Sequence, residues 1–372
     1  MRGLRKSGKR HRGLRPGLLG ALLAALAAEA LVGCSARAPA APPAATGTWF
    51  QLLSGTLQPL ANLAASRPVA RAPWTVQSRV ADMAFLGNDL YAGINGIGLA
   101  VLGRDPQGGL HVTYHPDALI FSHRTLTTLI PREGGVTVHL YYNALLNDTL
   151  RQDLSLAGIS FVTFSANLND YAFLVPPFQR KNPDWEAVGL APESQNSFDV
   201  EWKFTDASET RFQYTRFHAD TRAEEPEDRD TFLSALGVPS IDGPSVPSGL
   251  ATFFAACRAQ LPAQPAGGAL VFSLRSRESP LKRSYRSRKE SETATVVPVF
   301  DDGGTLLALL PDGRLLSQAP GRSPKVVRLP NLPSGFQYTD LVVWNRSLLL
   351  PWEEQAFTDV ARAGILVYPW AG

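Results

Sequence analysis

The chain has 372 residues, with 36 Lys and Arg against 33 Asp and Glu, two cysteines and a formal net charge of +3. This length allows two or three ordinary domains or one large repeat array. A hydrophobic content of 44% with 19% charged residues excludes an intrinsically disordered chain. Two cysteines exclude a disulfide framework and any multi-cysteine metal or iron–sulfur site.

The first 33 residues have the organisation of an export signal. Residues 1–15 carry seven basic residues and no acid, and residues 16–33 are rich in Ala and Leu. The negative inner face of a membrane holds such a basic stretch while the apolar stretch inserts. Because Pro16 and Glu29 make this stretch a poor permanent span, we predict that residues 1–33 are cleaved.

The signal ends in Leu31, Val32, Gly33 and Cys34, a series that resembles the lipobox of bacterial lipoproteins. The resemblance implies that Cys34 is lipidated and becomes the mature N-terminus. It also implies a place in the bacterial cell envelope, and Ser35 after the cysteine favours the outer membrane. The alternative is an ordinary secretory signal followed by an incidental cysteine.

Residues 34–46 are rich in Ala and Pro, a composition that stays extended and predicts a tether. Without residues 1–33 the chain carries 29 basic and 32 acidic residues, a charge of about −3. This balance does not indicate a nucleic-acid partner. Cys257 lies in an apolar, helix-like run and is expected to be a buried, unpaired small hydrophobic residue.

The remaining body, residues 47–372, has the pattern of repeated β-hairpins. Short apolar or alternating strands flank turns of Asn, Asp and Gly, residues that tolerate positive φ or hydrogen-bond their own backbone. The clearest examples are residues 80–91, 125–142, 296–309 and 338–350. Further alternating pairs are expected over residues 198–217 and 269–289.

The spacing of these hairpins predicts a β-propeller. Successive first turns lie roughly 40–50 residues apart, the length of a propeller blade. We therefore predict an all-β fold, a β-propeller of about six blades with a small helical insertion over about 228–262. The alternatives are an irregular pair of β-sandwiches or two β domains divided near 222–268. The body is similar to exported β-propeller lipoproteins in general.

Two further expectations concern how such a fold is built. Residues 49–55 form a lone strand that would pair with residues 363–370 and so remove exposed sheet edges. Asp82 and Asp340 hold equivalent places at the start of two first strands, which favours a role in building blades over catalysis. The acidic run 224–230 has the composition of a solvated linker that ends at a helix N-terminus, where Asp230 could cap the helix or complement its dipole.

The most distinctive charged segment is residues 275–289, which carry seven basic residues against one acid. A protruding hairpin of this kind would form a positive patch for an anionic lipid headgroup, a glycan or an acidic protein face. The alternative is a solvated loop. The candidate residues are Arg275, Arg277, Lys282, Arg283, Arg286, Arg288 and Lys289.

The sequence offers no strong catalytic motif, and we predict no catalytic residue, no cofactor and no metal site. His111 and His115 could share one face of a strand near His123, but Pro116 interrupts the geometry that zinc requires. Three functions stay open. The first is a lipid-anchored envelope protein whose propeller is a binding or assembly scaffold for a protein or glycan. The others are a surface-exposed adhesin or ligand-binding lipoprotein, and an envelope glycan-processing enzyme.

Overall fold

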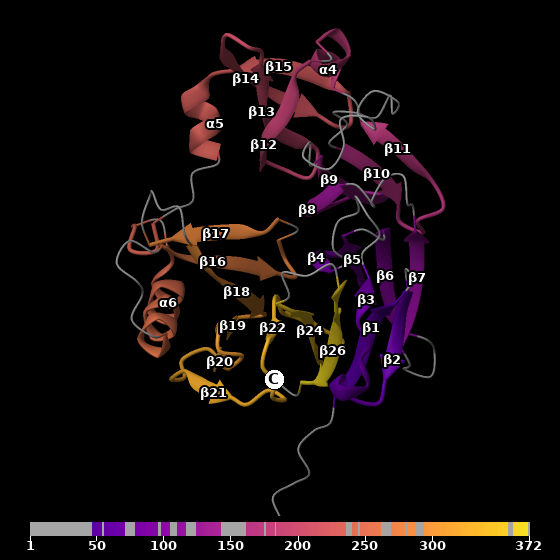
Figure 1. Ribbon diagram of the computed structural model, residues 1–372. Helices are drawn as coiled ribbons and strands as arrows, with labels where there is room; N and C mark the ends of the chain where they lie inside the picture. The colour runs from indigo at the N-terminus through magenta and orange to yellow at the C-terminus, as the bar shows by residue number, and fades with distance from the viewer. Residues whose placement is uncertain are drawn as a thin grey trace, which may run out of the picture. The chain divides into compact units, whose positions relative to one another are not determined.

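The computed structural model describes most of the chain between residues 47 and 370 (Figure 1). The described residues are 47–53, 56–70, 79–95, 98–104, 110–116, 124–142, 161–174, 176–182, 184–235, 240–244, 246–261, 269–279, 281–287, 294–355 and 360–370. The predicted signal peptide, Cys34 and the tether lie outside these residues.

Three consecutive sheets are four-stranded antiparallel meanders, in which each strand pairs with the next along the chain. The first contains β4 (Val80–Leu86), β5 (Asp89–Ile94), β6 (Gly98–Arg104) and β7 (Leu110–Pro116). The second contains β8 (Arg124–Arg132), β9 (Gly135–Tyr142), β10 (Phe161–Ser165) and β11 (Tyr171–Leu174). The third contains β12 (Glu186–Pro192), β13 (Ser197–Thr205), β14 (Thr210–His218) and β15 (Ala223–Glu227). A four-stranded meander is the blade of a β-propeller.

The fourth sheet combines a meander with an added pair of strands. Its order is β17-β16-β18-β19-β20-β21, and β16 pairs with β18 in parallel. Because a parallel pair needs a crossover, it joins segments that are not adjacent hairpin partners. The strands are β16 (Ala269–Ser276), β17 (Arg283–Arg286), β18 (Ala294–Asp302), β19 (Thr305–Leu309), β20 (Leu315–Gln318) and β21 (Lys325–Val327).

The fifth sheet joins the two ends of the body. β1 pairs with β26 in antiparallel register, with Trp49 opposite Leu366, as the sequence predicted (Figure 1). Gly364 permits this approach, because a Cβ there would lie 1.9 Å from the carbonyl oxygen of Phe50. The sheet contains β1 (Thr48–Leu53), β2 (Thr56–Leu60), β22 (Phe336–Tyr338), β23 (Val342–Trp344), β24 (Ser347–Glu354) and β26 (Ala363–Pro369). A separate two-stranded sheet contains β3 (Val69–Ala70) and β25 (Val360–Ala361).

The hairpin turns have the chemistry that the sequence indicated. Asn345 and Arg346, between β23 and β24, both adopt positive φ, of 47° and 57°, as the favoured two-residue hairpin turn requires. Gly134 and Gly303 supply the same region of φ in the turns after β8 and β18.

Helices occupy the connections. α5 (Arg229–Ala235) and α6 (Ser248–Gln260) lie within the expected insertion, and two shorter elements are η1 (Leu63–Ala65) and α4 (Pro177–Lys181). α6 covers one face of the fourth sheet, where Phe254 stacks on Phe272 with ring centroids 4.2 Å apart. Cys257 is buried in the same cluster, in agreement with the sequence.

Apolar clusters join each sheet to its neighbours. One cluster connects the fourth, fifth and first sheets through residues such as Phe300, Trp344 and Leu90. A second connects the first and second sheets, and a third connects the second and third around Phe161. Burial of one such side chain contributes about 1.5–3 kcal/mol, so these clusters hold the sheets together.

The fold is therefore all-β and propeller-like, with a small helical insertion, as predicted. The described residues form five sheets of four or more strands, so the expected number of about six blades stays a prediction. The interpretation of residues 224–230 as a linker was wrong, because Ala223–Glu227 is the edge strand β15. The cap of α5 is Asp228, whose Oδ1 accepts a hydrogen bond from Thr231 N at 2.9 Å. Asp230 lies in the first turn of α5, the position in which an acid complements the helix dipole.

Candidate functional site

A polar pocket lies where four of the five large sheets meet. Its cavity has a volume of about 500 Å³. The lining comes from the start of β4, from β8, from β16 and β18, from the residue before β17, from β24 and from the segment between β22 and β23. Charged side chains of both signs line it, namely Arg79, Lys282, Asp340 and Glu353.

Beneath this pocket a buried ion-pair network is centred on Asp82 of β4. Its side chain is 3% exposed. Arg275 Nη2 lies 2.5 Å from Asp82 Oδ1, and Lys282 Nζ lies 2.8 Å from the same oxygen. The other carboxylate oxygen accepts a hydrogen bond from Leu129 N at 2.9 Å. Arg275 also pairs with Asp340 Oδ2 at 3.1 Å, so the network joins four sheets.

Strand geometry explains why Asp82 faces β8. A bulge between Leu126 and Thr128 disturbs the β8–β9 ladder, and a bulge turns backbone N–H groups away from their strand partner. Asn95 Oδ1 accepts from Leu126 N at 2.8 Å, as Asp82 accepts from Leu129 N. The first sheet thus satisfies two buried N–H groups of the second.

The pKa of Asp82 follows from two opposing effects. Burial alone would raise the pKa of this carboxyl group, but the charges of Lys282 and Arg275 and the Leu129 hydrogen bond together lower it. Burial alone would lower the pKa of Arg275, but the charges of Asp340 and Asp82 raise it. A carboxylate held ionised in this way is poorly suited to donate a proton at neutral pH. Because its contacts join different sheets, the network has the position of a structural element, and the blade-building role of Asp82 and Asp340 stays a prediction.

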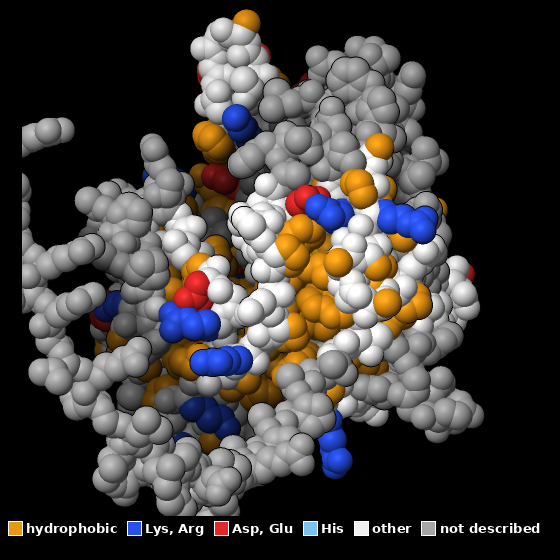
Figure 2. Space-filling model, turned by 60° about the horizontal axis from the view of Figure 1, so that its bottom comes forward, with side chains coloured by type: hydrophobic (Ala, Val, Ile, Leu, Met, Phe, Trp, Pro, Cys, Tyr) orange, Lys and Arg blue, Asp and Glu red, His pale blue; other side chains and the backbone are white. Residues whose placement is uncertain are grey.

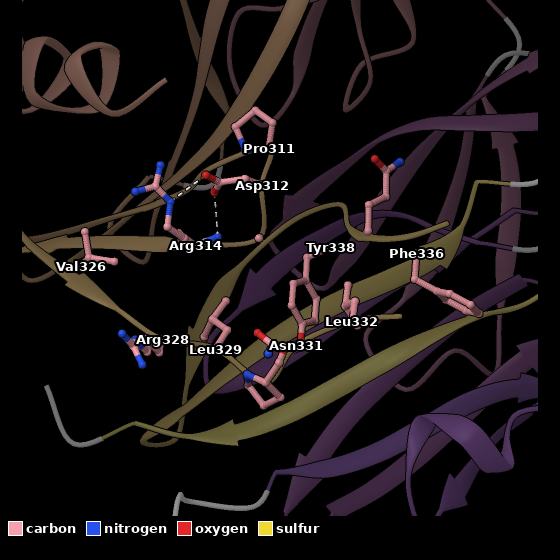
Figure 3. A pocket seen from close by; sticks show the side chains of 13 residues that line it. Pro311, Asp312, Arg314, Val326, Arg328, Leu329, Asn331, Leu332, Phe336 and Tyr338 are labelled. Carbon is pink, nitrogen blue, oxygen red and sulfur yellow. Dashed lines mark hydrogen bonds and ion pairs between the residues drawn. The ribbon is translucent and has the colours of Figure 1, made fainter. Parts of the chain in front are cut away.

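A larger cavity, of about 980 Å³, opens beside the fourth and fifth sheets. Figure 3 shows Asp312 and Arg314 paired on one side of it and Leu329, Leu332 and Tyr338 on the other. Figure 2, which turns the bottom of Figure 1 forward, shows hydrophobic side chains gathered on that face with Lys and Arg among them.

Two side chains that line this cavity make hydrogen bonds to neighbouring segments of the chain. Arg314 Nε lies 2.6 Å from Asp312 Oδ2, and its Nη2 donates to the carbonyl oxygen of Gln260 at the end of α6. Tyr338 Oη donates to the carbonyl oxygen of Pro330 at 2.9 Å. Val326 at the lining is 44% exposed. The cavity thus combines apolar, guanidinium, amide and backbone groups, which is the mixture found in ligand and peptide sites.

The seven predicted basic residues do not share one environment. Arg275 is buried, and its charge and that of Lys282 are neutralised by Asp82 and Asp340. Arg277 lies over the ring of Phe85 and within 4.0 Å of Asp302. Arg283 and Arg286 lie on β17, where Arg283 is exposed and Arg286 is half-buried. Arg288 and Lys289 lie outside the described residues, as does Cys34.

The three predicted histidines lie only partly within the described residues. His111 and His115 are on β7, and His123 lies outside the described residues. Across the described ranges, no group of three or more His, Cys, Asp or Glu is placed to hold a metal ion. In that same part of the chain, no helix has the length and apolar character needed to span a membrane.

Comparison with known proteins identifies the family. Residues 38–370 match the model of a family of unknown function, DUF8086, and the chain belongs to this family. No curated protein matches the sequence.

Solved structures give matches of low sequence identity and low TM-score. A prolyl endopeptidase structure covers 80% of this chain at 11% identity with a TM-score of 0.30, and this chain spans 42% of its length. The endo-arabinase of Bacteroides thetaiotaomicron VPI-5482 covers 82% at 12% identity with a TM-score of 0.29, over 98% of its own length. BamB from Moraxella catarrhalis covers 76% at 9% identity with a TM-score of 0.24, over 82% of its own length.

Proposed function

We propose that this protein is a lipid-anchored component of the bacterial cell envelope whose β-propeller acts as a binding or assembly scaffold. Cys34 is the lipidated residue of this proposal, and Ser35 favours the outer membrane. The folded body begins at Thr48 soon after the Ala/Pro-rich tether. Because β1 is hydrogen-bonded to both β2 and β26, a force applied through the anchor would be borne by the fifth sheet.

The observation that carries the scaffold function is the open cavity of about 980 Å³. Its apolar, amide and guanidinium groups lie on strands and on the turns between them, and one of its two guanidinium groups, that of Arg314, is paired with Asp312. Arg314 and Tyr338 are hydrogen-bonded to backbone carbonyl groups, and side chains restrained before binding lower the entropic cost of binding a partner. The partner of this proposal is an exported protein or an envelope glycan.

The anchor is tested by the intact mass of the membrane-extracted protein. A chain that starts at residue 34 with added acyl mass is expected, and the added mass is expected to be lost in Cys34→Ala. A soluble chain without lipid, or one with Cys34 joined to Cys257, would overturn the anchor.

Docking at the cavity is tested by site-specific photocrosslinking in cells. A photoreactive amino acid replaces Val326, which lines the cavity, and in a matched control replaces Phe212. Both side chains are close to half exposed, but Phe212 lies on the third sheet. The expected result is a discrete adduct from position 326 in the anchored protein, weakened in Cys34→Ala and lacking from position 212. The same adducts from both positions would refute docking at this cavity.

A further inference from the structure

On the sheet of β12–β15, one guanidinium group is surrounded by three carboxylates. Arg216 Nε lies 2.8 Å from Asp199 Oδ1 and 3.1 Å from Glu193 Oε2. Its Nη2 lies 2.9 Å from Glu227 Oε1. Asp199 stands directly opposite Arg216 in the β13–β14 ladder. A single positive charge therefore faces three negative charges within this group.

Two carboxylate oxygens in this group are buried without a hydrogen-bond partner. They are Asp199 Oδ2, on a side chain with no exposed surface, and Glu227 Oε2, on a side chain that is 5% exposed. Burial, and next to it the charge of Asp199, raise the pKa of Glu227. A buried charged oxygen destabilises the protein unless a hydrogen-bond donor contacts it, so a cation with N–H donors would stabilise this arrangement.

A cavity of about 560 Å³ borders this group, although Glu227 does not line it. Asp199, Arg216 and Glu193 line it from the sheet, and Asp230, Thr231 and Ser234 line it from α5. Glu193 is 45% exposed at its side chain, which places an acid where a ligand enters. The lining therefore offers carboxylate and hydroxyl acceptors together with a buried carboxylate behind them.

The spacing of these acids favours an organic cation over a metal ion. No set of three acidic, His or Cys side chains within the described ranges converges as a metal requires. An ammonium or guanidinium group carries several N–H donors in different directions and can reach separate acceptors. We propose that the cavity between α5 and this sheet binds an alkylammonium or guanidinium group, with Asp199 Oδ2 as its buried acceptor and Glu193 at its entrance.

The site is independent of the docking cavity proposed above and can be tested on the full-length protein. The probes are spermidine and a capped peptide with two lysines, titrated by calorimetry at low ionic strength. The same peptide with both lysines acetylated controls for charge. Binding of spermidine alone would assign a free polyamine as the ligand, and tighter binding of the lysine peptide would assign a basic side chain of a protein.

Asp199→Asn is expected to weaken binding about tenfold or more, because it removes a charge-assisted hydrogen bond. Glu193→Gln changes a half-exposed residue and is expected to weaken binding of the cation about threefold. Glu209→Gln removes an exposed acid that pairs with Arg211 on the same hairpin but does not line the cavity, and should leave the affinity unchanged.

Three results would overturn the proposal. They are equal affinities in Glu193→Gln and Glu209→Gln, calcium binding that is lost in Asp199→Asn, and the lack of heat from either cation at millimolar concentration. If Asp199→Asn does not fold, the Glu193→Gln comparison decides the question by itself.

Discussion

Removal of the Asp82 side chain tests the ion-pair network most directly. Asp82→Ala leaves Leu129 N without its acceptor, removes the partner of Lys282, and leaves Arg275 paired with Asp340 alone. Breaking a buried pair costs about 3–5 kcal/mol. Because Asp340 still neutralises Arg275, we expect a loss near the lower limit, about 3 kcal/mol.

The assay is urea-induced unfolding followed by tryptophan fluorescence. The double variant Asp82→Ala/Arg275→Met removes both buried charges. Its loss in free energy of unfolding should therefore be smaller than the sum of the two single losses, by about 1–3 kcal/mol. The matched surface control is Asp312→Ala, which removes an exposed pair with Arg314 and should change the free energy of unfolding by less than about 1 kcal/mol.

The pH dependence gives an independent test of the same network. The pKa of Asp82 is lower in the folded protein than in the unfolded chain, where it is near 4. Its contribution to stability is therefore complete above about pH 4 and is lost as the pH falls towards the folded pKa. The difference between wild type and Asp82→Ala should shrink below pH 4. A loss under about 1 kcal/mol at pH 7, or additive single losses, would refute the reasoning.

Three further predictions concern other parts of the fold. Gly364→Ala should lower the free energy of unfolding by about 3 kcal/mol, because the added Cβ would clash with the carbonyl oxygen of Phe50. In the control Gly103→Ala the added Cβ has no atom within 4 Å, so the free energy of unfolding should change little. Burial lowers the pKa of His139 to about 4, so stability should be complete above about pH 6.5 and fall by about 3 kcal/mol as the pH drops towards 4. A His139→Phe variant that shows the same loss would contradict this cause. Burial raises the pKa of the Cys257 thiol to about 12, so a thiol reagent at pH 8 should label it only after unfolding, and rapid native labelling would show that the thiol is accessible.

The sequence predicted the elements that depend on local chemistry. The turn at Asn345 and Arg346 and the hairpin of residues 198–217 follow from turn residues and alternation. The pairing of β1 with β26 was predicted from the need to remove exposed sheet edges. Hairpin register also follows from the turn, so the opposition of Asp199 and Arg216 could have been found by counting back from the turn at residues 206–209. The parallel pairing of β16 with β18 had no such signal, because the turn rules apply to neighbouring antiparallel strands.

The environment of each charge was decided by the tertiary structure. The run of basic residues at 275–289 has the composition of an exposed hairpin, yet Arg275 is buried against Asp82, 193 positions away, and Asp340, 65 positions away. Composition determines how many charges a segment carries, whereas burial and the partners of each charge depend on sheets that meet only after folding. By itself the sequence determined an all-β chain of hairpins closed by its own first strand. Which charges stabilise that body, and which stay available to a ligand, was decided by the packing of its sheets.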